Sequence, residues 1–93
     1  MGALQVELQD LVTAIVSSLV DHPSEVRVTS AQGESCTMLE VHVNKDDIGK
    51  VIGRQGHTAS AIRTILSNAA GKHRTRVILD IAEPNRRRAA PQD

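Results

Sequence analysis

The chain has 93 residues, which is enough for one domain with a modest two-layer core. It contains no Trp, Tyr or Phe, which excludes RNA recognition by stacking bases on aromatic rings. Its formal net charge is zero, but residues 1–47 carry a net charge of −6 and residues 48–93 one of +6. The second half therefore suggests an anionic partner, unless a balanced protein has simply distributed its charges unevenly.

Cysteine content and hydropathy indicate the cellular compartment. Cys36 is the only cysteine, so the chain forms no internal disulfide and a reducing compartment fits. No apolar run approaches transmembrane length, and the N-terminus lacks the basic region of a signal peptide. The sequence predicts a cytoplasmic protein.

The first third of the chain predicts a helix followed by two strands. Apolar residues recur at helical spacing until His22-Pro23 stops the pattern, and the stripe comprises Leu4, Leu8, Leu11, Val12, Ile15 and Leu19, widened by Val16 and Val20. The period then changes to two, with the alternating residues Val26, Val28, Leu39, Val41 and Val43. The polar stretch at residues 31–34 predicts the hairpin connection between these strands.

Two helices and a last strand follow. Asn44 can cap a short helix whose first turn holds Asp46 and Asp47, and Gly53 offers it an exit with positive φ. A second helix is expected from about His57 to Gly71, burying Ala59, Ile62, Ile65, Leu66 and Ala69. The last strand alternates Val77, Leu79 and Ile81. The predicted fold is an α+β two-layer sandwich in one domain, residues 1–83, before a disordered Arg-rich tail, residues 84–93.

The segment that indicates function is Ile48-Gly49-Lys50-Val51-Ile52-Gly53-Arg54-Gln55-Gly56. A bare Gly-x-x-Gly is a weak signal, but this one lies between two short amphipathic helices. A glycine at each end lets the backbone turn sharply and approach a ligand closely. The loop precedes a helix N-terminus, whose unpaired N–H groups and positive dipole end attract phosphate. Between residues 48 and 79 there are six basic side chains and no carboxylate.

This segment resembles the KH signature, in which Ile-Gly-x-x-Gly joins two helices. A helix and a hairpin precede it and one strand follows, as in the bacterial type II KH arrangement. Residues 51–65, residues 69–73, Leu19-Val20-Asp21-His22-Pro23 and Leu39-Glu40-Val41-His42-Val43 are similar to the small stand-alone KH proteins of the KhpA (YlqC) family. The resemblance covers roughly residues 4–82.

The resemblance implies a bacterial protein that binds single-stranded RNA with low sequence specificity and needs no cofactor. It also implies a homodimer, or a heterodimer with a larger KH-containing protein of the KhpB (Jag) type. The family suggests roles in RNA chaperoning and post-transcriptional regulation, and in cell-division, cell-shape and cell-wall control.

The candidate RNA-binding residues are Gly53, Arg54, Gln55, Gly56, Lys50, Ile52, His57 and Arg63. Several have a simpler interpretation. Lys50 is either a contact or a complement to its own helix dipole, and His57 is either a phosphate ligand or a solvated first-turn residue. Ile52 belongs to the core, to a groove or to both. Arg63 serves RNA, a dimer partner or neither. The tail residues Arg86, Arg87 and Arg88 either add phosphate attraction or are only solvated.

An enzyme is disfavoured by content. The four His residues and Cys36 lack metal-ligand spacing, and no nucleophile has a recognisable base beside it. The glycine loop lacks the Gly-Lys-Ser/Thr ending of a P-loop. The stronger alternative is a protein-interaction module with a degenerate KH fold, which dimerises through the apolar flank at Ala61, Ile62 and Ile65 and binds little RNA.

Overall fold

The structure, a computed structural model, describes residues 3–72 and 74–83. The tail predicted for residues 84–93 and the side chain of Leu4 lie outside these described parts. Within the described part, no helix combines the length and the apolar character needed to cross a bilayer.

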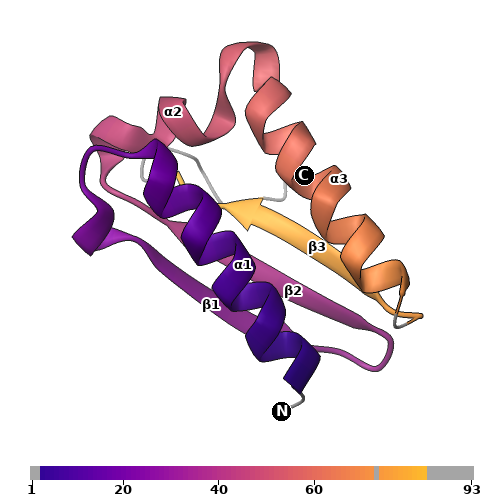
Figure 1. Cartoon of the computed structure of the whole chain (residues 1–93). Helices are drawn as coiled ribbons and strands as arrows, with labels where there is room; N and C mark the ends of the chain where they lie inside the picture. Colours follow the sequence, from indigo (N-terminus) through magenta and orange to yellow (C-terminus); the bar gives the residue numbers. More distant parts are fainter. Residues whose placement is uncertain (1–2, 73, 84–93) are drawn as a thin grey trace, which may run out of the picture.

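Two long helices lie on one face of a three-stranded sheet (Figure 1). In chain order the elements are α1 (Ala3–Leu19), β1 (Arg27–Gln32), β2 (Cys36–His42), α2 (Ile48–Ile52), α3 (His57–Gly71) and β3 (Arg76–Ile81). Short 3-10 helices occupy Pro23–Glu25, Lys45–Asp47 and Arg54–Gly56. The predicted order and the α+β sandwich class are confirmed.

The sheet has the order β1-β2-β3, with β2 at its centre. β1 and β2 are antiparallel, and β1 continues to Gln32, so the connection is shorter and later than the predicted stretch at residues 31–34. Gly33 N donates to Cys36 O (2.8 Å) to close this hairpin. β2 and β3 are parallel, which requires a crossover. The crossover contains α2 and α3, so the turn between these helices lies beyond one end of the sheet (Figure 1).

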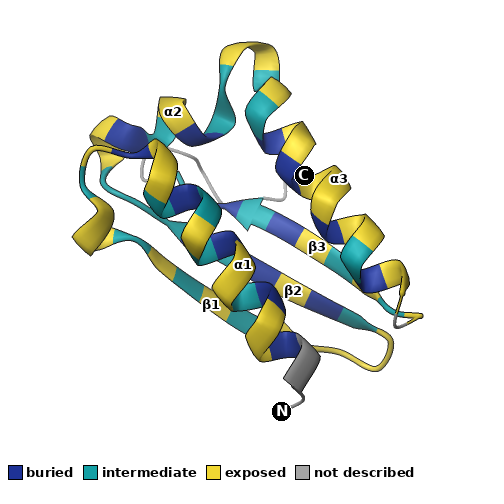
Figure 2. Ribbon diagram, viewed as in Figure 1, coloured by how far each residue is buried: buried dark blue, intermediate teal, exposed yellow. Residues whose placement is uncertain are grey.

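The core lies between the helices and the sheet (Figure 2). Its members are fully or almost fully buried: Leu8, Val12 and Val16 of α1, Leu39 and Val41 of β2, Val51 of α2, Ala59, Ile62 and Leu66 of α3, and Leu79 and Ile81 of β3. Burial of these aliphatic side chains from every layer, at roughly 1.5–3 kcal/mol each, replaces the aromatic core that the composition rules out.

The predicted helical stripes are partly wrong. Leu11 and Leu19 are 36% and 38% exposed, because α1 turns the row Leu8, Val12 and Val16 toward the sheet. Ile65 is 47% exposed, and Ala70 takes the buried position that the stripe of α3 requires. A helix that contacts a sheet on one side buries a narrow row at spacing four, and the flanking apolar residues stay in solvent.

The predicted capping of the helix after β2 is confirmed in a modified form. The Asn44 side chain accepts a hydrogen bond from Asp46 N (2.8 Å), but it caps the 3-10 turn Lys45–Asp47, and α2 begins only at Ile48. Asp47 was predicted in the first turn of this helix; it lies in the preceding 3-10 turn, and its side chain is completely buried.

Candidate nucleic-acid interface

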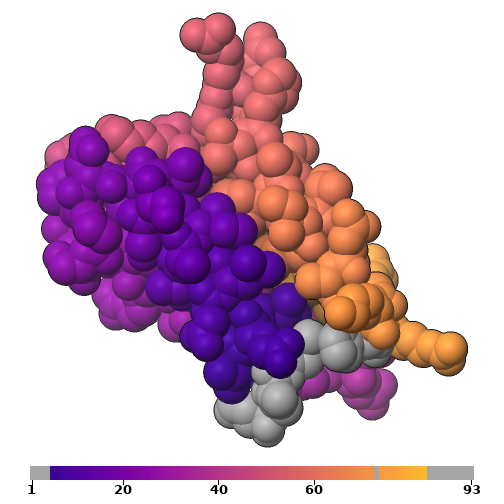
Figure 3. Space-filling view, viewed as in Figure 1, coloured from indigo at the N-terminus to yellow at the C-terminus, as the bar shows by residue number. Residues whose placement is uncertain are grey.

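The glycine loop (residues 53–56) turns the chain between α2 and α3 with three residues at positive φ. Gly53 has φ 78° and ψ 173°, Gln55 has φ 55°, and Gly56 has φ 77° and ψ 10°. Gly56 N donates to Gly53 O (3.1 Å), which closes the turn. The loop projects from the body of the molecule, at the top of the view in Figures 1 and 3. It is therefore presented to solvent on a rigid support of two helices.

The two glycines of the loop have different surroundings. A Cβ atom on Gly53 would lie 2.2 Å from Thr58 Oγ1 and 2.8 Å from Thr58 N, so this position cannot hold a side chain. A Cβ on Gly56 would meet nothing within 4 Å. Gly53 is therefore required by the packing of the loop against the start of α3, whereas the space beside Gly56 is open to a ligand.

The loop side chains and the N-terminus of α3 form one exposed, acid-free tip. Arg54, Gln55 and His57 are all exposed. α3 is 15 residues long, Gly56 is its N-cap, and its first turn contains no acidic residue. Free N–H groups at the start of such a helix, together with its dipole, make a site for an anion. Five of the predicted residues, Gly53 to His57, are thus brought together here.

A groove of about 170 Å³ runs from the loop along α3 and β3. It is lined by Ile52, Gly56, Ala59, Arg63, Asp80, Ile81 and Glu83. This places the predicted residues Ile52 and Arg63 beside the loop. Arg63 also donates from Nε to the carbonyl oxygen of Leu79 (3.4 Å), a bond to the edge of β3.

The acids of this groove are the residues that sequence reasoning missed. Asp80 and Glu83 follow the acid-free stretch in the chain, but the parallel pairing of β3 with β2 brings them next to Gly56. The distribution of charge along the sequence does not show that these acids lie near the loop, because only the folded chain brings the end of β3 close to Gly56.

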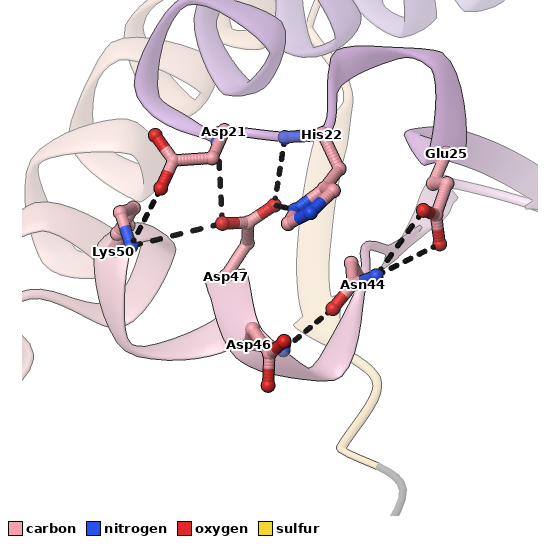
Figure 4. A network of polar contacts seen from close by, with 7 residues as sticks. All are labelled: Asp21, His22, Glu25, Asn44, Asp46, Asp47 and Lys50. Atoms are coloured by element: carbon pink, nitrogen blue, oxygen red, sulfur yellow. Dashed lines mark hydrogen bonds and ion pairs between the residues drawn. The ribbon is translucent and has the colours of Figure 1, made fainter.

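Lys50 is not part of the exposed tip. Its ammonium group lies 3.4 Å from Asp21 Oδ2 and 3.7 Å from Asp47 Oδ1 (Figure 4). The structure therefore pairs the Lys50 charge with one acid after α1 and one at the start of α2. The remaining cations of the basic stretch are also remote, because Lys72, Arg74 and Arg76 follow α3 at its other end, about 22 Å along a 15-residue helix. These three cations therefore do not adjoin the glycine loop.

A polar cluster around the buried Asp47 joins the segment after α1 to the start of α2 (Figure 4). Asp47 Oδ2 accepts from His22 N (3.0 Å) and contacts His22 Nδ1 (2.9 Å), while Oδ1 accepts from Asp21 N (3.2 Å). Nothing in the periodic pattern indicated this role. The one available signal was the Asp21-His22-Pro23 segment, whose N–H groups lie beyond the helix and need acceptors.

The cluster shifts the pKa of both titratable partners. The hydrogen bond to Asp47 raises the pKa of His22 above 6.5, and the nearby carboxylates of Asp47, Glu25 and Asp21 add to this against a smaller opposing effect of desolvation. Burial raises the pKa of Asp47, but hydrogen bonds from the His22 ring and from the backbone N–H groups of Asp21 and His22 outweigh it. The pKa of Asp47 therefore lies below 3.8. Both shifts favour the ionised pair. No group of three or more His, Cys, Asp or Glu side chains in residues 3–72 and 74–83 is arranged to hold a metal ion.

Comparison with known proteins identifies the family. Residues 9–81 match the KH domain of KhpA/KhpB. The chain is 46% identical over 74 residues to RNA-binding protein KhpA of Clostridium acetobutylicum, covering 80% of this chain and 99% of the relative. It is 45% identical over 76 residues to RNA-binding protein KhpA of Halalkalibacterium halodurans, covering 82% of this chain and all of the relative. RNA-binding protein KhpA of Borreliella burgdorferi is 46% identical over 74 residues, with 80% and 90% covered. No solved structure gives a significant match. The chain belongs to the KhpA/KhpB family of KH-domain proteins.

Proposed function

We propose that this protein binds single-stranded RNA by holding its sugar–phosphate backbone on the glycine loop. The observation that carries the proposal is the open space beside Gly56, at an acid-free helix N-terminus flanked by the exposed Arg54 and Gln55. The relatives support it, since they are named RNA-binding proteins and align over about four-fifths of the chain.

Each part of the interface has a distinct task. The N–H groups at the start of α3 and the Arg54 guanidinium attract a phosphate, and protonated His57 adds charge at the same point. Gly56 allows close approach of the RNA backbone, Gly53 lets the loop pack against Thr58, and Gln55 donates or accepts hydrogen bonds. The bases lie against Ile52, Ala59 and Arg63 in the groove, so the loop spans about four nucleotides without aromatic stacking. Lys50, which is paired with Asp21 and Asp47, lies outside this contact surface.

Within the cell, we propose a cytoplasmic RNA chaperone or post-transcriptional regulator that acts on many RNAs. Its domain comprises residues 1–83, and Arg86, Arg87 and Arg88 beyond it add non-specific attraction to phosphate. The protein pairs with a second copy or with a larger KH-containing partner of the KhpB (Jag) type. Two loops on one particle strengthen weak individual binding by avidity.

The loop is tested by replacing Arg54 and Gln55 together with Asp. The double variant places negative charge in the anion site and should abolish binding of a labelled single-stranded RNA of 12 nucleotides, measured by fluorescence anisotropy. Lys72→Asp with Asn68→Asp is the matched control, because it makes the same change in charge at exposed positions near the other end of α3. Circular dichroism must show all variants folded. A folded Arg54/Gln55 variant that binds RNA as well as the control would refute the loop proposal.

Salt dependence gives an independent measure of phosphate contacts. If the tip neutralises about three phosphates, the slope of log affinity against log salt is roughly −2 for a single strand. Affinity then falls about 20-fold between 50 and 200 mM salt. A slope near zero would mean that binding does not depend on phosphate.

The second candidate is a dimerisation module whose loop binds little RNA. It is favoured by Ile65, which is 47% exposed, beside the exposed Ala61 on α3. Sedimentation at tens of micromolar should give a dimeric mass for the wild type and a monomeric mass for Ile65→Asp. Met38→Asp, at an equally exposed apolar position on the outer face of the sheet, is the control. A wild-type monomer at that concentration contradicts self-association.

A further inference from the structure

The Asp47 carboxylate is completely buried, and its hydrogen-bond donors come from the segment that follows α1. Its Oδ2 contacts the backbone and the ring of His22, and its Oδ1 contacts the backbone of Asp21 and the Lys50 ammonium group. His22 and Asp21 are separated from Asp47 by 25 and 26 positions in the sequence. Lys50, in contrast, is a local partner three residues after Asp47. The contact therefore fastens the beginning of α2 to the chain leaving α1.

The start of α2 needs such an anchor. α2 has only five residues, too few for a helix to hold its own conformation or position. Two buried groups fix it: the Asp47 side chain at its N-cap and Val51 in the core. The glycine loop begins directly at the end of α2. The other arm of the loop, α3, is anchored separately by Ile62 and Leu66.

The two ends of the glycine loop are anchored independently of each other. Its two ends are held by different parts of the core, so a displacement of α2 moves Gly53 relative to the N-terminus of α3. Gly53 lies close against the start of α3, since a Cβ atom added to it would meet atoms of Thr58 at 2.2 to 2.8 Å. The arrangement of N–H groups at Gly56 then depends on where α2 is held.

We propose that Asp47 is a positioning residue for the glycine loop, and that the His22 ring closes the contact when protonated, so that RNA affinity follows the charge of His22. This inference rests on the proposed function. Asp47 and His22 touch no RNA; they act by holding α2 in the position that the RNA-binding conformation requires. Neutral His22 can still donate from Nδ1, but it loses the attraction between its positive charge and the buried Asp47 carboxylate.

The charged groups around His22 favour this coupling. Asp47 faces it from the start of α2, Glu25 from the 3-10 turn Pro23–Glu25, and Asp21 from the neighbouring position. Besides His22 itself, the cluster contains the cation Lys50, whose ammonium group lies 3.7 Å from Asp47 Oδ1 and 3.4 Å from Asp21 Oδ2. Together these carboxylates raise the pKa of His22, which places its loss of charge in the pH range above 6.5.

Three variants separate positioning from general stability. Asp47→Asn keeps the shape and removes the charge. His22→Asn keeps an amide donor near the place of Nδ1 but does not titrate. Leu8→Ala removes core volume at the far end of α1 and lowers stability without touching the cluster. Urea unfolding of each variant defines conditions in which at least about 95% of the protein is folded, and RNA affinity is compared there.

The expected result is a loss of about tenfold in RNA affinity for Asp47→Asn, with Leu8→Ala within twofold of the wild type. A tenfold loss means that the binding-competent position of α2 is populated about one-tenth of the time. Between pH 5.5 and 8.5 at constant ionic strength, wild-type affinity should fall more steeply than that of His22→Asn. His57 is present in both proteins, so the difference between the two profiles belongs to His22.

Two outcomes overturn the inference. One is Asp47→Asn binding within twofold of Leu8→Ala, and the other is a pH profile of His22→Asn that matches the wild type. Failure of the proposed function is distinguishable, because then the wild type binds no RNA at all. In that case amide hydrogen exchange tests whether Asp47 holds α2 in place. Faster exchange of residues 48–56 in Asp47→Asn than in Leu8→Ala supports this role, and equal exchange refutes it.

Discussion

Alanine at Gly53 should destabilise the fold several times more than alanine at Gly56, although both glycines have φ near 78°. At Gly56, with ψ 10°, the backbone is left-handed helical, and an L-residue there costs about 1–2 kcal/mol. Space beside it is open, so no steric term is added. At Gly53, with ψ 173°, the backbone lies in a region reserved essentially for glycine, at a cost of about 1–3 kcal/mol.

The steric term widens the difference. A Cβ on Gly53 would approach three atoms of Thr58 to between 2.2 and 2.8 Å, and one of them is backbone nitrogen. Relief requires a shift of the start of α3, and forced overpacking costs about 1–3 kcal/mol. The total for Gly53→Ala is about 2–6 kcal/mol, a large part of the roughly 4–12 kcal/mol expected for a domain of this size. For Gly56→Ala the melting temperature should fall by about 4–8 °C per kcal/mol.

Urea unfolding of both variants measures these costs, with unchanged m-values as the sign of unchanged folded and unfolded states. Asn substitutions at the same positions sharpen the test, because Asn tolerates left-handed helical backbone but not the region of Gly53. Gly56→Asn should be nearly neutral and Gly53→Asn strongly destabilising. Equal losses at the two positions, within about 0.5 kcal/mol, would refute the assignment of a structural role to Gly53 alone.

Three further outcomes follow from burial and charge. Leu66→Ala should cost about 2–5 kcal/mol in urea unfolding, whereas Ile65→Ala, at a half-exposed site, should cost less than about 1 kcal/mol; the opposite order would refute the orientation of α3. Stability should be highest between pH 4 and 6.5: it falls in acid as Asp47 is protonated, and it falls above pH 6.5 as His22 loses its proton through its raised pKa. In His22→Asn the loss of stability above pH 6.5 should be smaller. If the urea midpoints of this variant fall above pH 6.5 as much as those of the wild type, the Asp47–His22 contact does not stabilise the fold. Glu83→Gln should raise RNA affinity roughly two- to fivefold by removing a negative charge from the groove, and unchanged affinity would place the RNA elsewhere.

The element order was predictable because each element carries a local signal. The period changes from helical to two after Pro23, and Gly53 marks the end of α2. The loop was predictable for the same reason, since its residues are consecutive. The hairpin of β1 and β2 was predictable from its polar connection, but the place of β3 was not, because the parallel contact of β2 and β3 depends on a crossover rather than on any local pattern.

Side-chain burial was less predictable where several apolar residues share one helix. Leu11, Leu19 and Ile65 have the right spacing for a core stripe, but each helix meets the sheet along a single row. Asp47 is the opposite case, because it is a charged residue that is buried. An acid after an N-cap residue normally favours solvent and the helix dipole. Its burial follows from the unpaired N–H groups of Asp21 and His22, which become its neighbours only once α1 and α2 meet.

The three-dimensional distribution of charge restricts how RNA can lie on the proposed interface. Asp21 and Asp47 neutralise Lys50 on one side of α2, and Asp80 and Glu83 line the groove on the other side of the loop. Net positive charge therefore concentrates at the tip, on Arg54 and the start of α3. Phosphates belong at this tip, and the bases, whose amino groups can donate to carboxylates, belong in the groove. Such a site holds few phosphates, so one domain binds weakly, and a dimer with two tips gains affinity that its individual loops lack.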